Sequence, residues 1–514
     1  MKKKSKAILV SAFFGIILLT STLAIALNSN LPKTSDNRDT MTGTPADNFS
    51  DEERTTYCGT GASKSNRYIT EFKIPTVCTQ PLAITTDPSG MVWFTESNTG
   101  KLAKFDPFSK LFTEYENTRL PKGVRSMMWG IDYALDENIW FTDESHDVLW
   151  KFSIVTKNYT SFSYPVSNNV VTFPQRLVID NKNILVNDLL GNKITSFDST
   201  QLGNELNYSI INSEVNNTVT GSPTIDSNGK LWYVVWVPQK GLGALVSYDR
   251  QANIGTVFKL PVGIIAPNGI SSDHQNNIWI TDAATNFFIS FDSTTQKFTK
   301  YVTSTPRQSV YGNATGIMKN PNSNPYWNKV DSNDRVWFNE HFANSIAVFD
   351  PKTNSLVEYL IPSQNPNWRD CTGLENCGTS MPLDFTINGD KIWFTEWVEN
   401  NIGLLESSTP LPIEVNLEPK EIILNKGETS TLSFTITQKE QLDGMITLTT
   451  ANTAAPNDII VSGVDKKITV ENQPETVSLS LSASEFALSG TYKLLVGAQY
   501  NEVTISQFIT ITIK

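Results

Sequence analysis

The sequence predicts an all-β protein: a seven-bladed β-propeller followed by an immunoglobulin-like β-sandwich, with an N-terminal signal or anchor helix. Three observations lead to this prediction. A strand-turn-strand block recurs seven times between residues 66 and 408. The pattern then changes to short alternating strands over residues 412–514. At the start of the chain, a basic segment precedes an apolar run, which is typical of exported proteins.

Residues 1–27 have two interpretations. Lysines crowd the first six positions, and residues 7–27 are a largely apolar run. Ala24 and Ala26 form a small-x-small pattern that favours a cleaved signal peptide, whereas a run of this length is also enough for an uncleaved membrane anchor. In both cases the remainder faces the cell exterior, and the polar residues 28–65 are expected to be a flexible linker.

The repeated block fixes the predicted architecture. Each copy has an apolar strand, a tight turn and an aromatic strand that usually ends in an acid, as in Val92-Trp-Phe-Thr-Glu96. Successive copies are 45 to 58 residues apart, a period that holds one four-stranded blade. We expect the aromatic side chains to pack between neighbouring blades. The anchor positions are Trp93, Trp140, Leu185, Trp232, Trp279, Trp337 and Trp393.

The propeller is predicted to span residues 66–408. Its seventh copy has no outermost strand of its own, because the chain enters a Ser- and Pro-rich segment after Leu405. An unattached strand at residues 68–75 precedes the first copy. We expect this strand to complete blade seven, since closure removes an exposed sheet edge.

Residues 412–514 read as a separate unit. Tryptophan is absent from this stretch, and apolar and polar residues alternate in short segments bounded by polar turns. About 100 residues of this pattern suit an immunoglobulin-like sandwich, although the cysteine pair of antibody domains is missing. Nothing in the segment identifies a ligand.

The four cysteines fit an oxidising compartment outside the cell. Cys371 and Cys377 are close enough to close a small loop, which leaves Cys58 for Cys78. Four cysteines allow three pairings, and a metal site is the other interpretation of the set. The formal net charge of -11 argues against a nucleic-acid partner, because there is no basic surplus to bind phosphates.

The repeat also carries a family resemblance. Ile-Trp-Phe-Thr-Glu, then Asn-x-Ile, Phe-Asp and Glu-Tyr-x-x-Pro, resembles the virginiamycin B lyase family over residues 66–408. The resemblance implies an enzyme that opens the ring of type B streptogramins at an ester bond by elimination. It also implies a Mg²⁺ ion at the mouth of the propeller, so any enzyme activity is expected to be that of a Mg-dependent carbon–oxygen lyase.

The resemblance implies particular site residues. The family uses a His after the Pro that opens the penultimate blade, a Glu-Pro-His at the opening of the last blade, and a Glu ending that blade's second strand. Here Tyr326 follows Pro325, and the triplet is Met381-Pro382-Leu383. Glu396 is the nearest match to the last carboxylate. Both histidines and one carboxylate of the family pattern are therefore replaced.

Acids end the second strand in six of the seven copies, and two interpretations remain open. They either cap the following turn or converge as cation ligands at the mouth. The acids are Glu96, Asp143, Asp188, Asp282, Glu340 and Glu396. In the second interpretation the metal ligands are Glu96, Glu340 and Glu396, the ion is Mg²⁺ or Ca²⁺, and His341 is the base. The catalytic set is then His341, Glu340 and Glu396.

Residues that open the innermost strands are expected to line the mouth as a ligand rim: Trp129, Gln175, Asn268 and Tyr326. Their aromatic and amide groups suit a small molecule, a glycan or a peptide. Two functions follow. One is a ligand-binding or recognition protein on the cell exterior, either membrane-anchored or secreted. The other is a metal-dependent propeller enzyme, a lyase acting on a cyclic ester or a lactonase-like hydrolase.

Overall fold

The computed structural model describes residues 58–59, 61–120, 126–165, 172–200, 205–238, 240–313, 321–464, 467–469 and 473–514. Strands dominate these ranges, whose only helical segments are α4 (Gln308–Tyr311) and η3 (Pro366–Trp368). The prediction of an all-β chain is therefore confirmed. The expected signal or anchor helix lies outside the described residues. Within the described ranges, no helix is both long and apolar enough to cross a bilayer.

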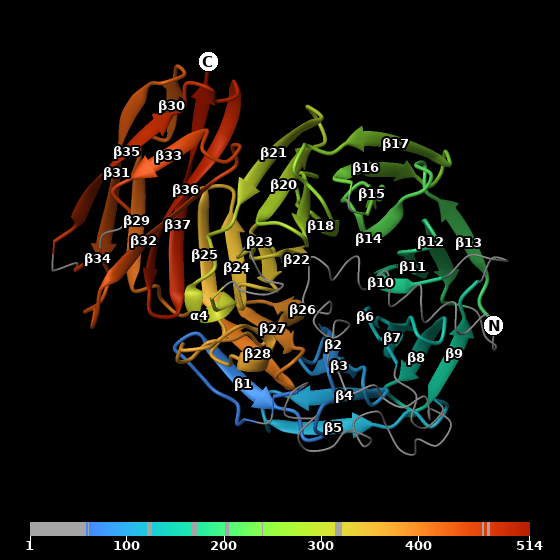
Figure 1. Ribbon diagram of the computed structural model, residues 1–514. Coiled ribbons are helices and arrows are strands. Elements are labelled where there is room, and N and C mark those ends of the chain that lie inside the picture. Colours follow the sequence, from blue (N-terminus) through green and yellow to red (C-terminus); the bar gives the residue numbers. More distant parts are fainter. Residues whose placement is uncertain are drawn as a thin grey trace.

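Strands β1 to β28 form seven antiparallel groups of four, arranged in a propeller-like ring (Figure 1). The first group is β2 (Pro81–Thr86), β3 (Val92–Glu96), β4 (Lys101–Asp106) and β5 (Leu111–Tyr115). The second is β6 (Ile131–Ala134), β7 (Asn138–Asp143), β8 (Val148–Ser153) and β9 (Tyr159–Ser163). The third is β10 (Pro174–Asp180), β11 (Asn183–Asp188), β12 (Lys193–Asp198) and β13 (Tyr208–Asn212).

The remaining groups continue in chain order around the ring. The fourth is β14 (Val219–Ile225), β15 (Leu231–Val237), β16 (Leu242–Asp249) and β17 (Ile254–Lys259). The fifth is β18 (Pro267–Ser272), β19 (Ile278–Asp282), β20 (Phe287–Asp292) and β21 (Lys297–Val302). The sixth is β22 (Pro325–Val330), β23 (Val336–Glu340), β24 (Ser345–Asp350) and β25 (Ser355–Leu360). The seventh combines β26 (Pro382–Asn388), β27 (Lys391–Glu396) and β28 (Asn401–Glu406) with β1 (Ile69–Lys73).

A recurring Asp–Trp hydrogen bond explains why these two residue types return in the repeat. The Asp87 carboxylate accepts from the backbone of the turn between the first two strands and from the indole of Trp93, at 2.8 Å. The fourth, fifth and sixth groups repeat the indole bond at 2.8–3.0 Å with pairs six residues apart: Asp226–Trp232, Asp273–Trp279 and Asp331–Trp337. The Asp carboxylate therefore stabilises the turn of the hairpin and orients the indole side chain that packs in the core.

The aromatic anchors pack between neighbouring groups, as the repeat predicted. Trp93 of β3 lies 5.9 Å, centroid to centroid, from Phe152 in the third strand of the next group. The same contact closes the ring, where Trp393 of the seventh group lies 5.6 Å from Phe105 of the first. These interfaces therefore bury a large aromatic surface between adjacent sheets, and this burial is the main favourable contribution to stacking them.

The first and last parts of the ring are joined by backbone pairing. Strand β1 pairs antiparallel with β28, from Ile69 opposite Leu405 to Lys73 opposite Asn401. The strand expected at residues 68–75 thus stands at the outer edge of the seventh group, next to the last strand before the C-terminal region. Pairing at this position satisfies the backbone groups of β28 that would otherwise be exposed.

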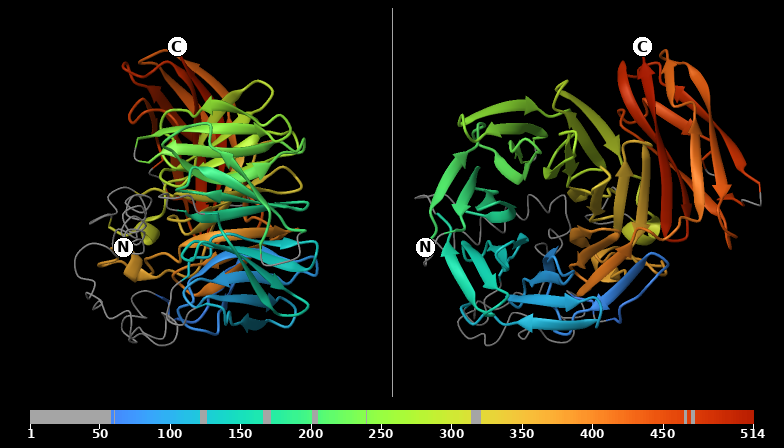
Figure 2. Two further views of the ribbon diagram at one scale, coloured as in Figure 1. Left: turned by 90° about the vertical axis from the view of Figure 1, so that its right-hand side faces the viewer. Right: turned by 180° about the vertical axis from the view of Figure 1, so that it is seen from behind.

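The C-terminal region, residues 413–513, contains one separate four-stranded sheet and a set of strands that extends the sheet of the sixth group, and both lie beside the ring (Figure 2). One contains β29 (Ile413–Glu418), β31 (Thr429–Gln438), β35 (Glu475–Ala483) and β33 (Ile459–Ser462). The other contains β37 (Val503–Ile513), β36 (Gly490–Tyr500), β32 (Ile446–Asn452) and β34 (Lys467–Ile468), with β30 (Glu421–Leu424) also paired to β37. Buried and exposed residues alternate along β29 and β35, so each strand turns one face to the core.

The C-terminal region is continuous with the ring, which the sequence did not indicate. Strand β37 pairs antiparallel with β25, with Val357 opposite Ile505, so one nine-stranded sheet runs from the sixth group into the C-terminal region. Phe508 of β37 packs against Phe288, Tyr301 and Phe349, at centroid distances of 5.4 to 6.4 Å. The two regions therefore share backbone hydrogen bonds and an aromatic core.

Two disulfides stabilise the connections on one face of the ring. Cys58 is joined to Cys78 and Cys371 to Cys377, as the spacing of the cysteines predicted. The first ties the segment before β1 to the start of the first group, and the second closes a loop between β25 and β26. No cysteine in the described chain is free, which fits an oxidising, extracellular environment.

Replacing Phe508 tests the shared core. Phe508→Ala should lower the free energy of unfolding by about 3–5 kcal/mol, because it opens a cavity among aromatic rings from both regions. Urea unfolding followed by tryptophan fluorescence measures the change, since tryptophans occur in the ring and not in residues 412–514. The control Phe486→Ala removes an exposed ring and should change stability by less than about 0.5 kcal/mol. An unchanged fluorescence transition in Phe508→Ala would show that the ring does not depend on β37.

Candidate functional site

The innermost strands begin, and the second strands end, on one face of the ring, which we call the mouth face. The register shows this directly, because Pro81 lies opposite Glu96 and Pro382 opposite Glu396. Residues proposed from the sequence as metal ligands, bases and rim groups all lie near this face. Their surroundings decide which of them can act together.

The three predicted metal ligands are not brought together. Glu96, Glu340 and Glu396 end β3, β23 and β27, and each is almost completely buried within its own group. Glu96 lies beside Glu114 and Lys101, Glu340 beside Glu358, and Glu396 beside Glu71 and Asn401. Nowhere in the described chain do three His, Cys, Asp or Glu side chains form a group that could hold a metal ion.

Side-chain length separates the acids into two kinds. The shorter Asp188 and Asp282 accept hydrogen bonds from backbone N–H groups of the turn that follows, from Gly191 N at 2.8 Å and Ala284 N at 3.1 Å. These contacts match the turn-capping interpretation. The longer Glu96, Glu340 and Glu396 reach toward an acid of the outermost strand in the same group.

Burial sets the protonation of the glutamates. Burial, with a smaller contribution from Glu114, raises the pKa of Glu96 to about 8. Burial and the neighbouring Glu358 raise the pKa of Glu340 well above its usual range, and burial beside Glu71 does the same for Glu396. Protonated carboxyl groups are poor metal ligands, so these acids are better suited to buried hydrogen bonding than to holding a cation.

His341 is buried behind the rim. Its Nδ1 lies 3.0 Å from the Pro382 carbonyl oxygen, and its ring is 5.6 Å from that of Tyr326. Burial lowers the pKa of His341 to about 4, so the imidazole is neutral at physiological pH. A neutral ring that faces a carbonyl acceptor donates from Nδ1. No described contact joins it to the carboxyl groups of Glu340 or Glu396, so the predicted catalytic trio is not assembled.

The predicted rim residues Trp129, Gln175, Asn268 and Tyr326 are all buried at the openings of the innermost strands or directly before them. Two of them are joined to the neighbouring group through their backbone oxygens. Gln175 O accepts from Thr142 Oγ1 at 2.6 Å, and Trp129 O accepts from Arg176 Nη1 at 3.2 Å. The rim residues therefore form hydrogen bonds between neighbouring groups and also border the channel.

Below the rim, the innermost strands enclose a central channel with a cavity of about 330 Å³. Its walls come from β6, β10, β14, β18 and β22. The lining is mainly polar at positions that face inward, and it includes Asp132, Arg176, Ser222, Thr224, Ser271, Ser272, Asn328 and Lys329. A volume of this size is within the range of small-ligand sites, about 300–1,000 Å³.

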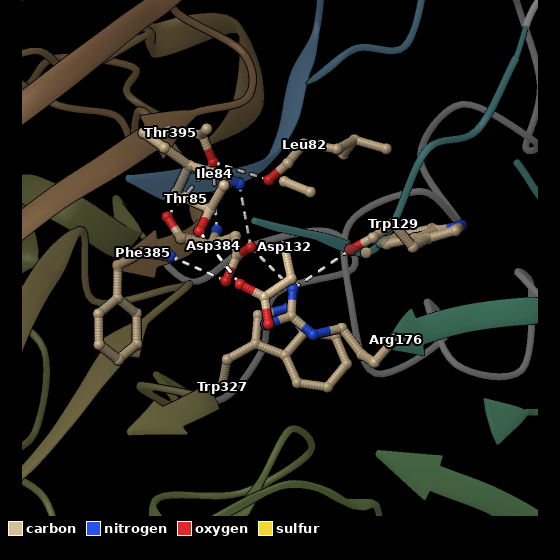
Figure 3. Close-up of polar contacts among 12 residues, drawn as sticks. Leu82, Ile84, Thr85, Trp129, Asp132, Arg176, Trp327, Asp384, Phe385 and Thr395 are labelled. Atoms are coloured by element: carbon tan, nitrogen blue, oxygen red, sulfur yellow. Dashed lines mark hydrogen bonds and ion pairs between the residues drawn. The ribbon is translucent and has the colours of Figure 1, made fainter. Parts of the chain in front are cut away.

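An ion pair crosses the ring at this level (Figure 3). Arg176 Nη1 of the third group lies 2.7 Å from Asp384 Oδ2 of the seventh, and the guanidinium stacks 4.7 Å from the centre of the Trp327 ring. Asp384 also accepts from Ile84 N at 3.2 Å, so the carboxylate is held by residues of the first and third groups. This contact joins segments more than 200 residues apart and fixes the position of both charges.

Asp132 and Lys329 complete the charged cluster of the channel. Asp132 accepts from Tyr133 N at 2.9 Å, and burial raises the pKa of its carboxyl group. Burial lowers the pKa of Lys329, partly offset by Asp384. No described carboxylate forms an ion pair with the Lys329 ammonium, which lies 5.8 Å from the centre of the Phe385 ring. The channel thus offers a cation and a carboxyl group to whatever occupies it.

These channel residues were not identified from the sequence. A signal was available in the register of the strands. Asp132 and Lys329 each lie opposite the anchor Trp of the neighbouring strand, and the same position in other groups is occupied by Thr85, Thr224 and Ser271. A charge among hydroxyl residues at one register position indicates a special role. Recognising it required knowing which face of the innermost strand points to the axis.

Solved structures of other proteins resemble the ring of strand groups. No family model matches the sequence, and no curated protein matches it. Among solved structures, a virginiamycin B lyase from Staphylococcus aureus is 18% identical, with a TM-score of 0.52, over 66% of this chain and 98% of the lyase. A streptogramin B lyase is 20% identical, with a TM-score of 0.51, over 66% of this chain and 97% of its own. The family resemblance seen in the repeat is thus present in the fold, and identity this low shows the fold alone.

Removing the charge of Asp384 tests the ion pair. Asp384→Asn should lower the free energy of unfolding by about 1.5–3 kcal/mol, because it leaves the Arg176 guanidinium without its charged acceptor. Urea unfolding at pH 7 measures the loss. The matched control is Asp180→Asn, which breaks the more exposed pair with Arg250 and should cost no more than about 1 kcal/mol. Equal effects would mean that the channel pair is solvated like a surface pair.

The raised pKa of Glu96 predicts a pH dependence of stability. Between its usual pKa of 4.5 and about 8, the folded protein keeps the proton that the unfolded chain releases. The free energy of unfolding therefore falls as pH rises through this window, by up to about 1.4 kcal/mol per pH unit for this one group. In Glu96→Gln the decline should be shallower. Urea midpoints at pH 5, 6.5 and 8 measure it, with the exposed Glu116→Gln as control, and parallel declines in both variants would contradict the raised pKa.

Proposed function

We propose that the protein is an extracellular recognition protein that binds a small polar molecule in the central channel. The observation that carries this proposal is the channel cavity, which is lined by the Asp132 carboxyl group and by the Lys329 ammonium, for which the described residues supply no ion pair. Ligand sites in proteins combine such an enclosed space with few convergent polar groups. A ligand with an acidic group for Lys329 and an amino or hydroxyl group for Asp132 fits best; a sugar acid or the end group of a glycan or peptide meets this description.

The residues at the mouth support binding over lyase chemistry. The positions where the resembling family has its catalytic histidines hold Tyr326 and Leu383, which are both buried. Two histidines lie near this face: His341 is neutral and hydrogen-bonded to Pro382 O, and His146 Nδ1 lies 2.7 Å from Asp143 Oδ2. The similar solved structures include a catalytically inactive virginiamycin B lyase with quinupristin, so a protein of similar fold can bind a ligand.

The metal-dependent enzyme remains the second candidate. It would be a carbon–oxygen lyase or a lactonase-like hydrolase with Mg²⁺ or Ca²⁺ at the mouth, held by Glu96, Glu340 and Glu396. The separation of these three acids into different buried surroundings speaks against it. Calorimetry of Mg²⁺ and Ca²⁺ binding to the full chain and to Glu396→Gln distinguishes the two, because stoichiometric binding lost in the variant would favour the enzyme.

Four finer assignments belong to the same proposal. The seven strand groups are the blades of a seven-bladed propeller spanning residues 66–408, completed by the strand at 68–75. Residues 412–514 are an immunoglobulin-like sandwich that braces blade six. Residues 1–27 are a signal peptide or membrane anchor, and residues 28–65 link it to the propeller. The disulfides Cys58–Cys78 and Cys371–Cys377 support this extracellular placement.

Variants of the channel charges test the proposed function. A panel of amino acids, sugar acids, dicarboxylates and short oligosaccharides should contain compounds that raise the melting temperature of the full chain in a saturable manner. Lys329→Met and Asp132→Asn should each lower the affinity for these compounds at least about tenfold, the value of one hydrogen bond to a charged group. The control Lys352→Met removes an exposed lysine and should leave the affinity unchanged. Compounds that bind both channel variants as tightly as the wild type would refute channel binding.

A further inference from the structure

A second polar cluster, made only of hydrogen-bond donors, lies at the mouth face between the sixth and seventh groups. It consists of Arg369 and Trp368, which end the 3-10 turn η3, and Trp397, which follows β27. The two indole rings lie 5.9 Å apart, centroid to centroid. All three residues are more than nine-tenths buried. Neither the channel proposal nor the family resemblance uses them.

Local structure holds this cluster in place. Asn365 accepts from Asn367 N and so caps η3, and Asn365 N donates to Thr379 O at 3.1 Å. The disulfide Cys371–Cys377 closes the loop between these two points. The guanidinium of Arg369 lies 4.8 Å from the centre of the Phe342 ring. The segment is therefore held by hydrogen bonds and a disulfide, and packing against Phe342 sets the direction of the Arg369 side chain.

Most of these donors lack an acceptor in the described part of the chain. Arg369 Nη1 donates to the Trp368 carbonyl oxygen at 2.7 Å, but Arg369 Nε and Nη2, Trp368 Nε1 and Trp397 Nε1 are buried without a hydrogen-bond partner in the described chain. Buried polar groups are nearly always hydrogen-bonded, because an unmade bond costs about 1–3 kcal/mol. Four such atoms on three neighbouring residues therefore call for an acceptor from outside the described chain.

Arg369 also differs from other arginines of the protein. Arg67, Arg176, Arg250 and Arg335 each form an ion pair with a carboxylate. Within the described residues no carboxylate forms an ion pair with Arg369, as is also true of Arg119 and Arg307, and burial lowers the pKa of the Arg369 guanidinium to about 9. Burying an arginine without a counter-charge is strongly unfavourable, so a site of this kind is stabilised when an anion binds.

We propose that the Arg369–Trp368–Trp397 cluster is a binding site for an oxyanion, a carboxylate or phosphate group of a ligand at the mouth. The two free guanidinium atoms, Nε and Nη2, belong to the same edge of the planar group, and this edge donates two parallel hydrogen bonds to a pair of oxygens. The two indole N–H groups supply further donors, and their rings shield the bond from water. The site is separate from the channel charges, so each can be tested without the other.

Anion titrations of the full chain test the proposal. Acetate and inorganic phosphate, added at constant ionic strength against chloride, should each be examined by calorimetry and by the shift in melting temperature. We expect saturable binding of at least one of them and a rise in melting temperature. The stronger anion shows whether the natural group is a carboxylate or a phosphate. Arg369→Gln should lower the affinity about tenfold or more, as expected for the loss of charge-assisted bonds.

Conservative variants keep the test decisive if Arg369→Gln does not fold. Trp368→Phe and Trp397→Phe retain aromatic packing and remove one donor each, so each should weaken anion binding severalfold. Arg335→Gln is the matched control, because this arginine already pairs with Asp331 at 2.7 Å, and its loss should leave anion affinity unchanged. Absence of saturable binding by either anion, or equal binding by the wild type and the tryptophan variants, would overturn the proposal and assign the donors to buried water. Lys329→Met removes the channel cation, so anion binding that persists in this variant and is lost in Arg369→Gln belongs to the mouth cluster.

Discussion

Pairing between strand edges that are remote in sequence holds the two ends of the described chain to the ring. A ring of sheets leaves unpaired backbone groups where the chain enters and leaves it, and such edges invite association. Two strands remote in sequence cover such edges: β1 pairs with β28 at the closure, and β37 pairs with β25 at the sixth group. Because these pairings join both ends of the described chain to the ring, the mouth, the channel and the C-terminal region are held in one continuous framework.

The repeated acids show how one sequence position serves different purposes. Asp188 and Asp282 bind the backbone of neighbouring turns, whereas Glu96, Glu340 and Glu396 extend one methylene further and meet an acid of the outermost strand. The repeat alone could not separate turn capping from cation binding, because both use carboxylates at the same register. Side-chain length and burial decide between them.

The candidate sites lie where the repeat is broken. Arg176, Asp384, Asp132 and Lys329 replace small or hydroxyl residues on the walls of the channel, and Arg369 lies in a connection that has no counterpart in the shorter copies. The seven groups supply equivalent positions around the central channel, and a charged residue at one of these positions changes which ligands the channel can bind. The two polar clusters differ in character: the channel contains charges of both signs, while the mouth cluster contains donors only.

The sequence by itself determined the all-β class and the repeat with its inter-group aromatic anchors, because these depend on local patterns of period and turn. The spacing of the cysteines favoured the observed pairs over two other pairings. The sequence also placed a strand at residues 68–75. The attachment of β37 to β25, the buried partners of each glutamate and the meeting of Arg176 with Asp384 were decided only by the tertiary structure. These contacts join residues far apart in the chain, and their register and direction follow from how the sheets pack around the axis, which no local pattern records.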